Sequence, residues 1–145
     1  MIQIQLTIIV FTLLFLISLI DLKTKKVPAF LTTALIFTIA MVNMQDINFG
    51  LIHLGFGALA FIFAYILYEL DFIGGIADIK VIVIIGMMII SLNHFFIFIT
   101  LIMIIGFAYK LIWRYVLKKP DDAEVPFIIS LWAVYSILLI NGGLI

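Results

Sequence analysis

The sequence contains no cysteine and only two histidines, and charged residues make up 11% of its 145 residues. Without cysteine the chain forms no disulfide and offers neither a thiolate nucleophile nor a thiolate ligand for zinc or an iron–sulfur cluster. Eight basic residues balance eight acidic ones, so there is no basic excess of the kind that binds nucleic acid. The sequence therefore disfavours thiol chemistry, metal chemistry and nucleic-acid partners, and we expect no cofactor.

Apolar side chains, in contrast, are abundant. Hydrophobic residues account for 67% of the chain and the mean hydropathy is +1.42, whereas an ordinary soluble domain is about 45–50% apolar. A chain of this length cannot bury so much apolar surface in one small core. Runs of about 18 apolar residues, long enough to cross a bilayer as helices, recur along the sequence. The sequence therefore predicts an integral membrane protein.

Six apolar runs cover almost the whole chain and predict a single all-α domain, residues 1–145, built as a bundle of six transmembrane helices. The expected spans are residues 3–20, 29–45, 50–68, 72–92, 94–113 and 127–145. The first run lacks the basic start and the cleavage site of a secretory signal peptide, so we expect it to remain in the mature protein.

The basic residues are distributed asymmetrically between the two sides of this bundle. All of them lie in or beside the connections that follow the first, third and fifth spans: Lys23, Lys25, Lys26, Lys80, Lys110, Arg114, Lys118 and Lys119. The connections after the second and fourth spans contain no lysine or arginine. By the positive-inside rule, the basic side is cytoplasmic and both termini lie outside.

Prolines mark the starts of two helices. Pro28 and Pro126 stand where the second and last spans begin, a position at which the missing N–H of proline has no cost. The residue before a proline avoids helical geometry, so the first helix can continue to about Lys26 before it breaks. We therefore expect Asp21 to lie in a helix.

Two acidic residues adjoin or enter apolar spans on the cytoplasmic side, Asp21 after the first span and Asp78 in the fourth. If the fourth span starts at Phe72, Asp78 lies about six residues, or roughly 9 Å, inside it. An aspartate at the centre of a transmembrane helix costs about 2.5–3.5 kcal/mol, so a retained one pairs with a cation, lines a wet cavity or takes part in function. Local pairs with Lys25 and Lys80 are the simpler alternative.

Two carboxylates at similar depth on one side of a bundle can also meet each other. Like charges a few ångströms apart cannot both ionise cheaply, so they share a proton: the charged member activates water and the protonated member polarises a carbonyl. Aspartyl peptidases work in this way, without metal, cysteine or histidine. Asp21 and Asp78 are therefore the candidate catalytic residues.

The residues around both aspartates resemble two motifs of the type IV prepilin and preflagellin leader peptidases, the GxGD class of membrane aspartyl peptidases. The first motif is an aspartate followed by a basic stretch and an aliphatic-Pro pair, here DLKTKKVP at residues 21–28. The second is Gly-x-Gly/Ala-Asp-x-Lys at the start of the fourth span, here GIADIK at residues 75–80. Val125-Pro126-Phe127, before the last span, is a weaker third similarity.

The resemblance implies that the protein removes the short basic leader from pilin-like or archaellin-like precursors at the cytoplasmic face of a prokaryotic cell membrane. It implies Asp21 and Asp78 as catalytic residues, with Gly75 and Lys80 as candidate supporting residues. Lys80 would hold the charge of Asp78 or contact the precursor, unless it only extends toward the cytoplasm. The expected partners are the precursor and the lipid bilayer, with no nucleic acid, and the oligomeric state stays open.

The chain departs from the family pattern in three respects. Ala77 stands where the motif has its second glycine, as in archaeal-type members, and Ala29 follows Pro28 where many bacterial members have asparagine. The cysteine-bearing cytoplasmic insert of larger bacterial members is missing. That insert accompanies N-methylation, so the resemblance implies peptidase activity without methyltransferase activity.

Other interpretations stay open at this point. A small transporter or ion-relay subunit would also use aspartates in apolar spans, and an inactive relative that acts as an assembly scaffold would tolerate Ala77. Five acidic residues form either a rim that attracts a basic leader or an ordinary solvated interface: Glu69, Asp71, Asp121, Asp122 and Glu124. His53 and His94 are expected near the opposite face, where they form neither a triad nor a metal site.

Overall fold

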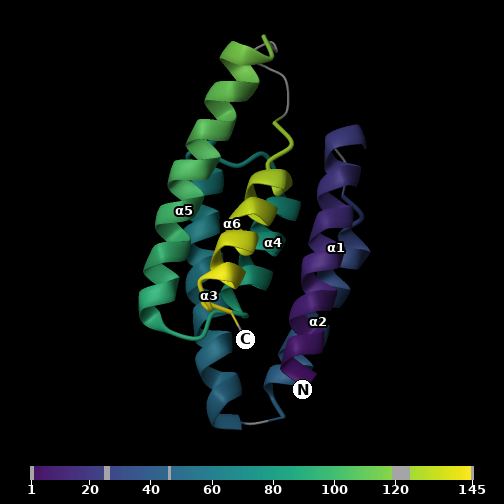
Figure 1. Ribbon diagram of the computed structural model, residues 1–145, viewed down its shortest axis with the longest axis vertical. Helices are drawn as coiled ribbons and strands as arrows, with labels where there is room; N and C mark the ends of the chain where they lie inside the picture. Colours follow the sequence, from purple (N-terminus) through teal and green to yellow (C-terminus); the bar gives the residue numbers. More distant parts are fainter. Residues whose placement is uncertain (1, 25–26, 46, 119–124, 145) are drawn as a thin grey trace.

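The chain is described by a computed structural model over residues 2–24, 27–45, 47–118 and 125–144. Within these residues it forms an elongated bundle of α-helices, shown in Figure 1. The elements are α1 (Ile2–Thr24), α2 (Ala29–Asn43), α3 (Ile47–Glu69), α4 (Ile76–Gly86), α5 (Leu92–Leu111), the short π-helix η1 (Ile112–Val116) and α6 (Ile128–Ile140). Several residues considered above lie outside the described residues: Lys25, Lys26, Lys119, Asp121, Asp122 and Glu124.

The expected all-helical membrane architecture is confirmed in its coarse form. Three segments are long and apolar enough to cross a bilayer, Gln5–Thr24, Gly50–Glu69 and Leu92–Val116. Their apolar side chains point outward as well as inward, which is typical of helices that face lipid. At about 1.5 Å per residue, α2, α4 and α6 are only about 16–23 Å long, short of the roughly 30 Å hydrocarbon layer. Six full spans and outward termini therefore remain predictions.

Helix α4 occupies the centre of the bundle. It packs most extensively on α3, and also on α2 and α6, whereas α1 packs on α6. The contact between α3 and α4 depends on small residues, because a Cβ added to Gly86 would come within 2.5 Å of the Cβ of Ala60. In Figure 1, α1 begins and α6 ends at one end of the bundle, while α1 ends and α4 begins toward the other.

Helix α4 starts later than the predicted span of residues 72–92, because α3 ends in a tight turn. Asp71 has a left-handed backbone (φ 53), and the N–H of Phe72 donates to the carbonyl of Leu67 at 2.8 Å. This is a Schellman-type helix end. After Gly75 in extended conformation, α4 begins at Ile76. Asp78 therefore lies in the first turn of α4, and the expected depth of about six residues is wrong.

Helix α4 also ends earlier than predicted, inside the bundle. The chain after Gly86 turns, and Met88 and Ile89 are fully buried. The side-chain amide of Asn43 donates to the carbonyl of Met87 at 3.0 Å, and Ile89 forms a bridge with Leu144. Irregular backbone at membrane depth is tolerated where protein covers it and its polar groups have partners.

The two histidines lie at this same end of α4. His53 is fully buried near the carbonyls of Met87 and Ile89. His94 contacts Ser91, with 2.7 Å between its Nδ1 and the serine Oγ. Both histidines therefore lie away from Asp78, which is at the other end of α4, as expected from the sequence.

Candidate active site

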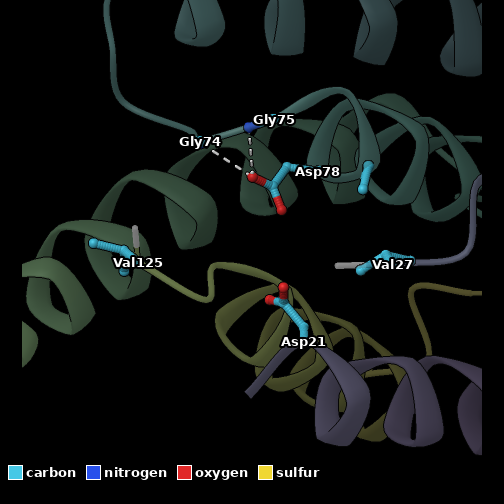
Figure 2. Close-up of a pocket in the computed structure, with 7 residues that line it drawn as sticks. Asp21, Val27, Gly74, Gly75, Asp78 and Val125 are labelled. Carbon is cyan, nitrogen blue, oxygen red and sulfur yellow. Dashed lines mark hydrogen bonds between the residues drawn. The ribbon is translucent and has the colours of Figure 1, made fainter. Parts of the chain in front are cut away.

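A small pocket lies where α1 ends and α4 begins, and both candidate aspartates line it (Figure 2). The pocket has a volume of about 110 Å³. Its lining consists of Asp21, Val27, Gly74, Gly75, Ala77, Asp78 and Val125. The three sequence segments that resembled family motifs thus come together around one cavity, although they are far apart in the chain.

Asp78 is held by the start of its own helix. It is the third residue of α4, and its Oδ2 accepts hydrogen bonds from the N–H groups of Gly74 and Gly75 at 3.1 and 3.2 Å. A carboxylate at this position also interacts favourably with the positive end of the helix dipole. Its second oxygen points across the pocket toward Asp21 in Figure 2. Asp78 therefore has a fixed orientation.

Asp21 lies in the last turn of α1, so its expected helical environment is confirmed. Its Oδ2 accepts a hydrogen bond from the backbone N–H of Ile128 at 3.3 Å. Ile128 is the first residue of α6, so the positive end of a second helix faces this carboxylate. Each aspartate is thus oriented by backbone N–H groups at the beginning of a helix.

The two carboxylates face each other from opposite sides of the pocket (Figure 2). Both side chains are buried, with Asp21 8% and Asp78 6% exposed, and they are close enough to interact electrostatically. Two acids in such a position share one proton more readily than they carry two charges. The arrangement can therefore supply one carboxylate as a base and one carboxylic acid as a proton donor.

Of the candidate supporting residues, Gly75 lies at the site and Lys80 does not. The N–H of Gly75 bonds Asp78, as described above. Lys80 extends to α2 instead, and its Nζ donates to Thr33 Oγ1 at 2.7 Å. The expectation that Lys80 holds the charge of Asp78 is thus corrected: Lys80 lies two residues after Asp78 on α4, and residues two apart on a helix point in nearly opposite directions.

Sequence analysis interpreted Gly74 and Gly75 as small spacers beside Asp78, and it did not foresee which groups orient the site. The N–H groups of Gly74 and Gly75 both donate hydrogen bonds to the carboxylate of Asp78, and the N–H of Ile128 donates one to the carboxylate of Asp21. Backbone donors carry no residue-type signal, although Val125-Pro126-Phe127 had indicated the beginning of the last helix. Lys110 donates to the carbonyl of Asp71 at 2.8 Å and so holds the turn that leads to Gly74.

The acidic rim is described only in part. Glu69 and Asp71 are exposed at the end of α3 and in the turn after it, on the side of the bundle where the pocket lies. Asp121, Asp122 and Glu124 lie outside the described residues. A role of this rim in attracting a precursor therefore stays a prediction.

An apolar helical bundle with two facing, buried carboxylates at one end defines a membrane protein equipped for aspartic-type hydrolysis. The chain belongs to the type IV leader peptidase family, whose sequence profile matches residues 8–113 and so includes Asp21 and Asp78. No curated protein and no solved structure matches the chain. The family resemblance recognised in the two motifs is confirmed, and the chain is an aspartic-type peptidase of the membrane.

Proposed function

We propose that this protein is a membrane aspartyl endopeptidase that cleaves the short basic leader from type IV pilin-like or archaellin-like precursors at the cytoplasmic face of the membrane. The observation that carries this proposal is the facing pair of Asp21 and Asp78 in the pocket between α1 and α4. Membership of the type IV leader peptidase family supports the reaction class.

The reaction follows from one proton shared by the two carboxylates. The ionised carboxylate accepts a proton from water as the water oxygen attacks the scissile carbonyl carbon, and the protonated carboxyl donates its proton to the carbonyl oxygen. The tetrahedral intermediate then collapses: the C–N bond breaks, the amine leaves with a proton from the pair, and a hydroxyl of the intermediate returns its proton to the other carboxylate, so the pair again holds one proton. The proton belongs to Asp21 and Asp78 jointly, so we assign the two roles to the pair.

Backbone N–H groups contribute by holding the two carboxylates in a fixed orientation. Gly74 and Gly75 orient Asp78, and Ile128 orients Asp21, so neither carboxylate has to reorganise when the precursor arrives. The acidic side chains of Glu69 and Asp71 are exposed at the end of α3 and in the turn that leads to Gly74, which lines the pocket. A basic leader would meet complementary charge there.

The test is cleavage of a pilin-like precursor with a basic leader in membranes, comparing wild type with Asp21→Asn and Asp78→Asn at matched protein levels. Asparagine keeps the size and polarity of aspartate but cannot ionise. We expect each variant to lose about a thousandfold or more in rate, as when one member of a catalytic pair is removed. Asp71→Asn is the matched control for kcat, because it makes the same change at an exposed position in the nearby turn. Loss of the charge of Asp71 acts on KM for a basic leader and leaves the chemical step intact.

Two results would contradict the proposal at different levels. Near-normal cleavage by Asp21→Asn or Asp78→Asn would show that these two aspartates are not the catalytic pair, although the protein would still be a peptidase. Failure of the folded wild type to cut any of several precursors would contradict the proposed cleavage of leader peptides and favour the ion-relay or scaffold interpretation. Measurement of ion flux in vesicles would then separate those two.

A further inference from the structure

Lys80 joins α4 to the beginning of α2. Its Nζ donates to Thr33 Oγ1 at 2.7 Å and lies 3.5 Å from the carbonyl oxygen of Ala29. Thr33 Oγ1 in turn donates to the carbonyl of Ala29 at 2.7 Å. A threonine hydroxyl has one proton to donate and lone pairs that accept, so one Thr33 oxygen serves both bonds. The three residues form a compact polar cluster between two helices.

Stabilisation of α2 does not account for the position of this lysine. Ala29 and Thr33 are the first and fifth residues of α2, and the N-terminal end of a helix carries partial positive charge, so a cation is disfavoured there. A lysine near a membrane surface ordinarily extends its ammonium group into water. Lys80 is half-buried and bonds neutral oxygens of the neighbouring helix instead. We therefore look for the role of this contact in the two helices that it joins, α4 and α2.

The contact of Lys80 with Thr33 and Ala29 connects two sides of the pocket. Asp78 is on α4, two residues before Lys80, and Val27, which lines the pocket, is two residues before Ala29. Val27 is three positions after Thr24, the last residue of α1, the helix that carries Asp21. Because α1 packs mainly on α6 while α4 packs mainly on α3 and α2, the spacing of the two aspartates depends on contacts outside the pair.

We propose that Lys80 is a positioning residue, which holds the beginning of α2, and with it the Val27 side of the pocket, at a fixed place relative to Asp78. It acts through Thr33 and Ala29 and does not touch the scissile bond. The inference deepens the proposed peptidase function and rests on it.

The test is a double-mutant cycle with Lys80→Met and Thr33→Val in the precursor-cleavage assay. Each single variant is expected to lose about tenfold in kcat, as for loss of a hydrogen bond to a charged group, with KM little changed. The double variant is expected to lose no more than either single one. Lys80→Arg keeps a donor of sufficient length and should retain most of the activity. The pH profile of the cleaving variants should keep its midpoints.

Thr38→Val is the matched control on the same helix. Thr38 Oγ1 donates to the carbonyl of Ala34 at 2.9 Å, which is the same bond within α2 that Thr33 makes to Ala29, but none of the lysines that the structure describes donates to Thr38. Thr38→Val should therefore cleave at the wild-type rate. If Thr33→Val behaves like Thr38→Val while Lys80→Met is impaired, Lys80 acts by another route and the proposal is wrong.

A second measurement is independent of cleavage. Because the chain has no cysteine, spin labels can be attached specifically at Phe30→Cys on α2 and Ile76→Cys on α4, both exposed positions. Lys80→Met and Thr33→Val should broaden the distribution of distances between the labels, and Thr38→Val should not. An unchanged distribution overturns the positioning role. If the two variants broaden the distribution but the wild type cuts no precursor, only the proposed function is overturned.

Discussion

Asp21, near the end of the first helix, accepts a hydrogen bond from the N–H of Ile128, 107 residues later at the start of the last helix. The same two helices are joined near their other ends by Tyr135, whose hydroxyl donates to the carbonyl of Thr7 at 3.1 Å. Between these bonds, the rings of Phe11 and Phe15 pack on Trp132. The position of one candidate catalytic residue is thus determined by the contact between α1 and α6.

Tyr135→Phe should weaken this contact without creating a cavity. The variant keeps the buried ring and removes only the hydrogen bond to Thr7, so we expect a loss of about 0.5–1.5 kcal/mol in stability. Thermal unfolding in detergent micelles measures it. Tyr115→Phe, at an exposed position after α5, makes the same chemical change and should leave the melting temperature unaltered. Equal melting temperatures for the two variants would contradict the role of Tyr135.

Gly75→Ala should be tolerated by the fold although Gly75 belongs to the motif. Its backbone is extended (φ −168), which any residue adopts, and no atom lies within 4 Å of an added Cβ. The N–H that bonds Asp78 remains. We therefore expect a melting temperature within about 1 °C of wild type, since substitutions without strain or lost contacts have small effects. A fall of several degrees would show that the glycine has a structural role.

Gly86→Ala should destabilise the bundle. The added Cβ would meet the Cβ of Ala60 at 2.5 Å and the carbonyl oxygen of Phe56 at 3.1 Å, so α3 and α4 must separate. Overpacking of this kind costs about 1–3 kcal/mol. Gly55→Ala is the control on α3, because nothing lies within 4 Å of its added Cβ. Chemical or thermal unfolding in micelles compares the two, and equal stabilities would argue against close packing of α3 on α4.

The cleavage rate should depend on pH with a bell-shaped profile. The proposed chemistry needs one proton on the Asp21–Asp78 pair, so the rate falls when the pair has lost both protons and when it holds two. Measurement of kcat/KM for precursor cleavage across the acidic and neutral range, in membranes, tests this. Asp71→Asn should give the same profile, because Asp71 is outside the pocket. A rate that only increases or only decreases across this pH range would contradict a proton shared by the pair.

The predicted topology can be tested with single cysteines, since the natural chain has none. A membrane-impermeant maleimide should label Gln45→Cys and Asn93→Cys from outside the cell. Lys23→Cys and Lys118→Cys should react only after the membrane is permeabilised, because the positive-inside rule places them in the cytoplasm. The opposite pattern would put the pocket on the outer face, and the proposed cleavage of cytoplasmic leaders would fail.

Hydropathy and motif order were sufficient to predict the helices, the family and the meeting of Asp21 with Asp78. The helices follow from composition, the family follows from its two motifs, and the meeting of the aspartates follows from the position of both at the same side of the bundle. The start of α4 was misplaced by four residues because the apolar Phe72 and Ile73 read as helix, whereas the Schellman turn at Asp71 excludes them. A hydropathy pattern does not distinguish a buried turn from a buried helix.

Sequence reasoning left the role of Lys80 open, and the contact that the structure shows was not among the alternatives. Neighbours in sequence suggested a pair with Asp78, but the helical rotation between them directs Lys80 toward Thr33, 47 positions away. The backbone donors at Gly74 and Ile128 were likewise invisible, because every non-proline residue has an N–H and only the tertiary fold selects which one meets a carboxylate.

The short central helix also bears on the membrane around the protein. With 11 residues, α4 is about 16 Å long, and α6 with 13 residues is about 20 Å long. Where α6 borders lipid, the acyl chains face a hydrophobic surface thinner than an average bilayer, and bilayers adapt to such mismatch by local thinning at a cost of a fraction of a kcal/mol per ångström. Lipids with short chains relieve that cost, so the thickness of the host membrane becomes a determinant of how firmly the first and last helices hold the pocket together.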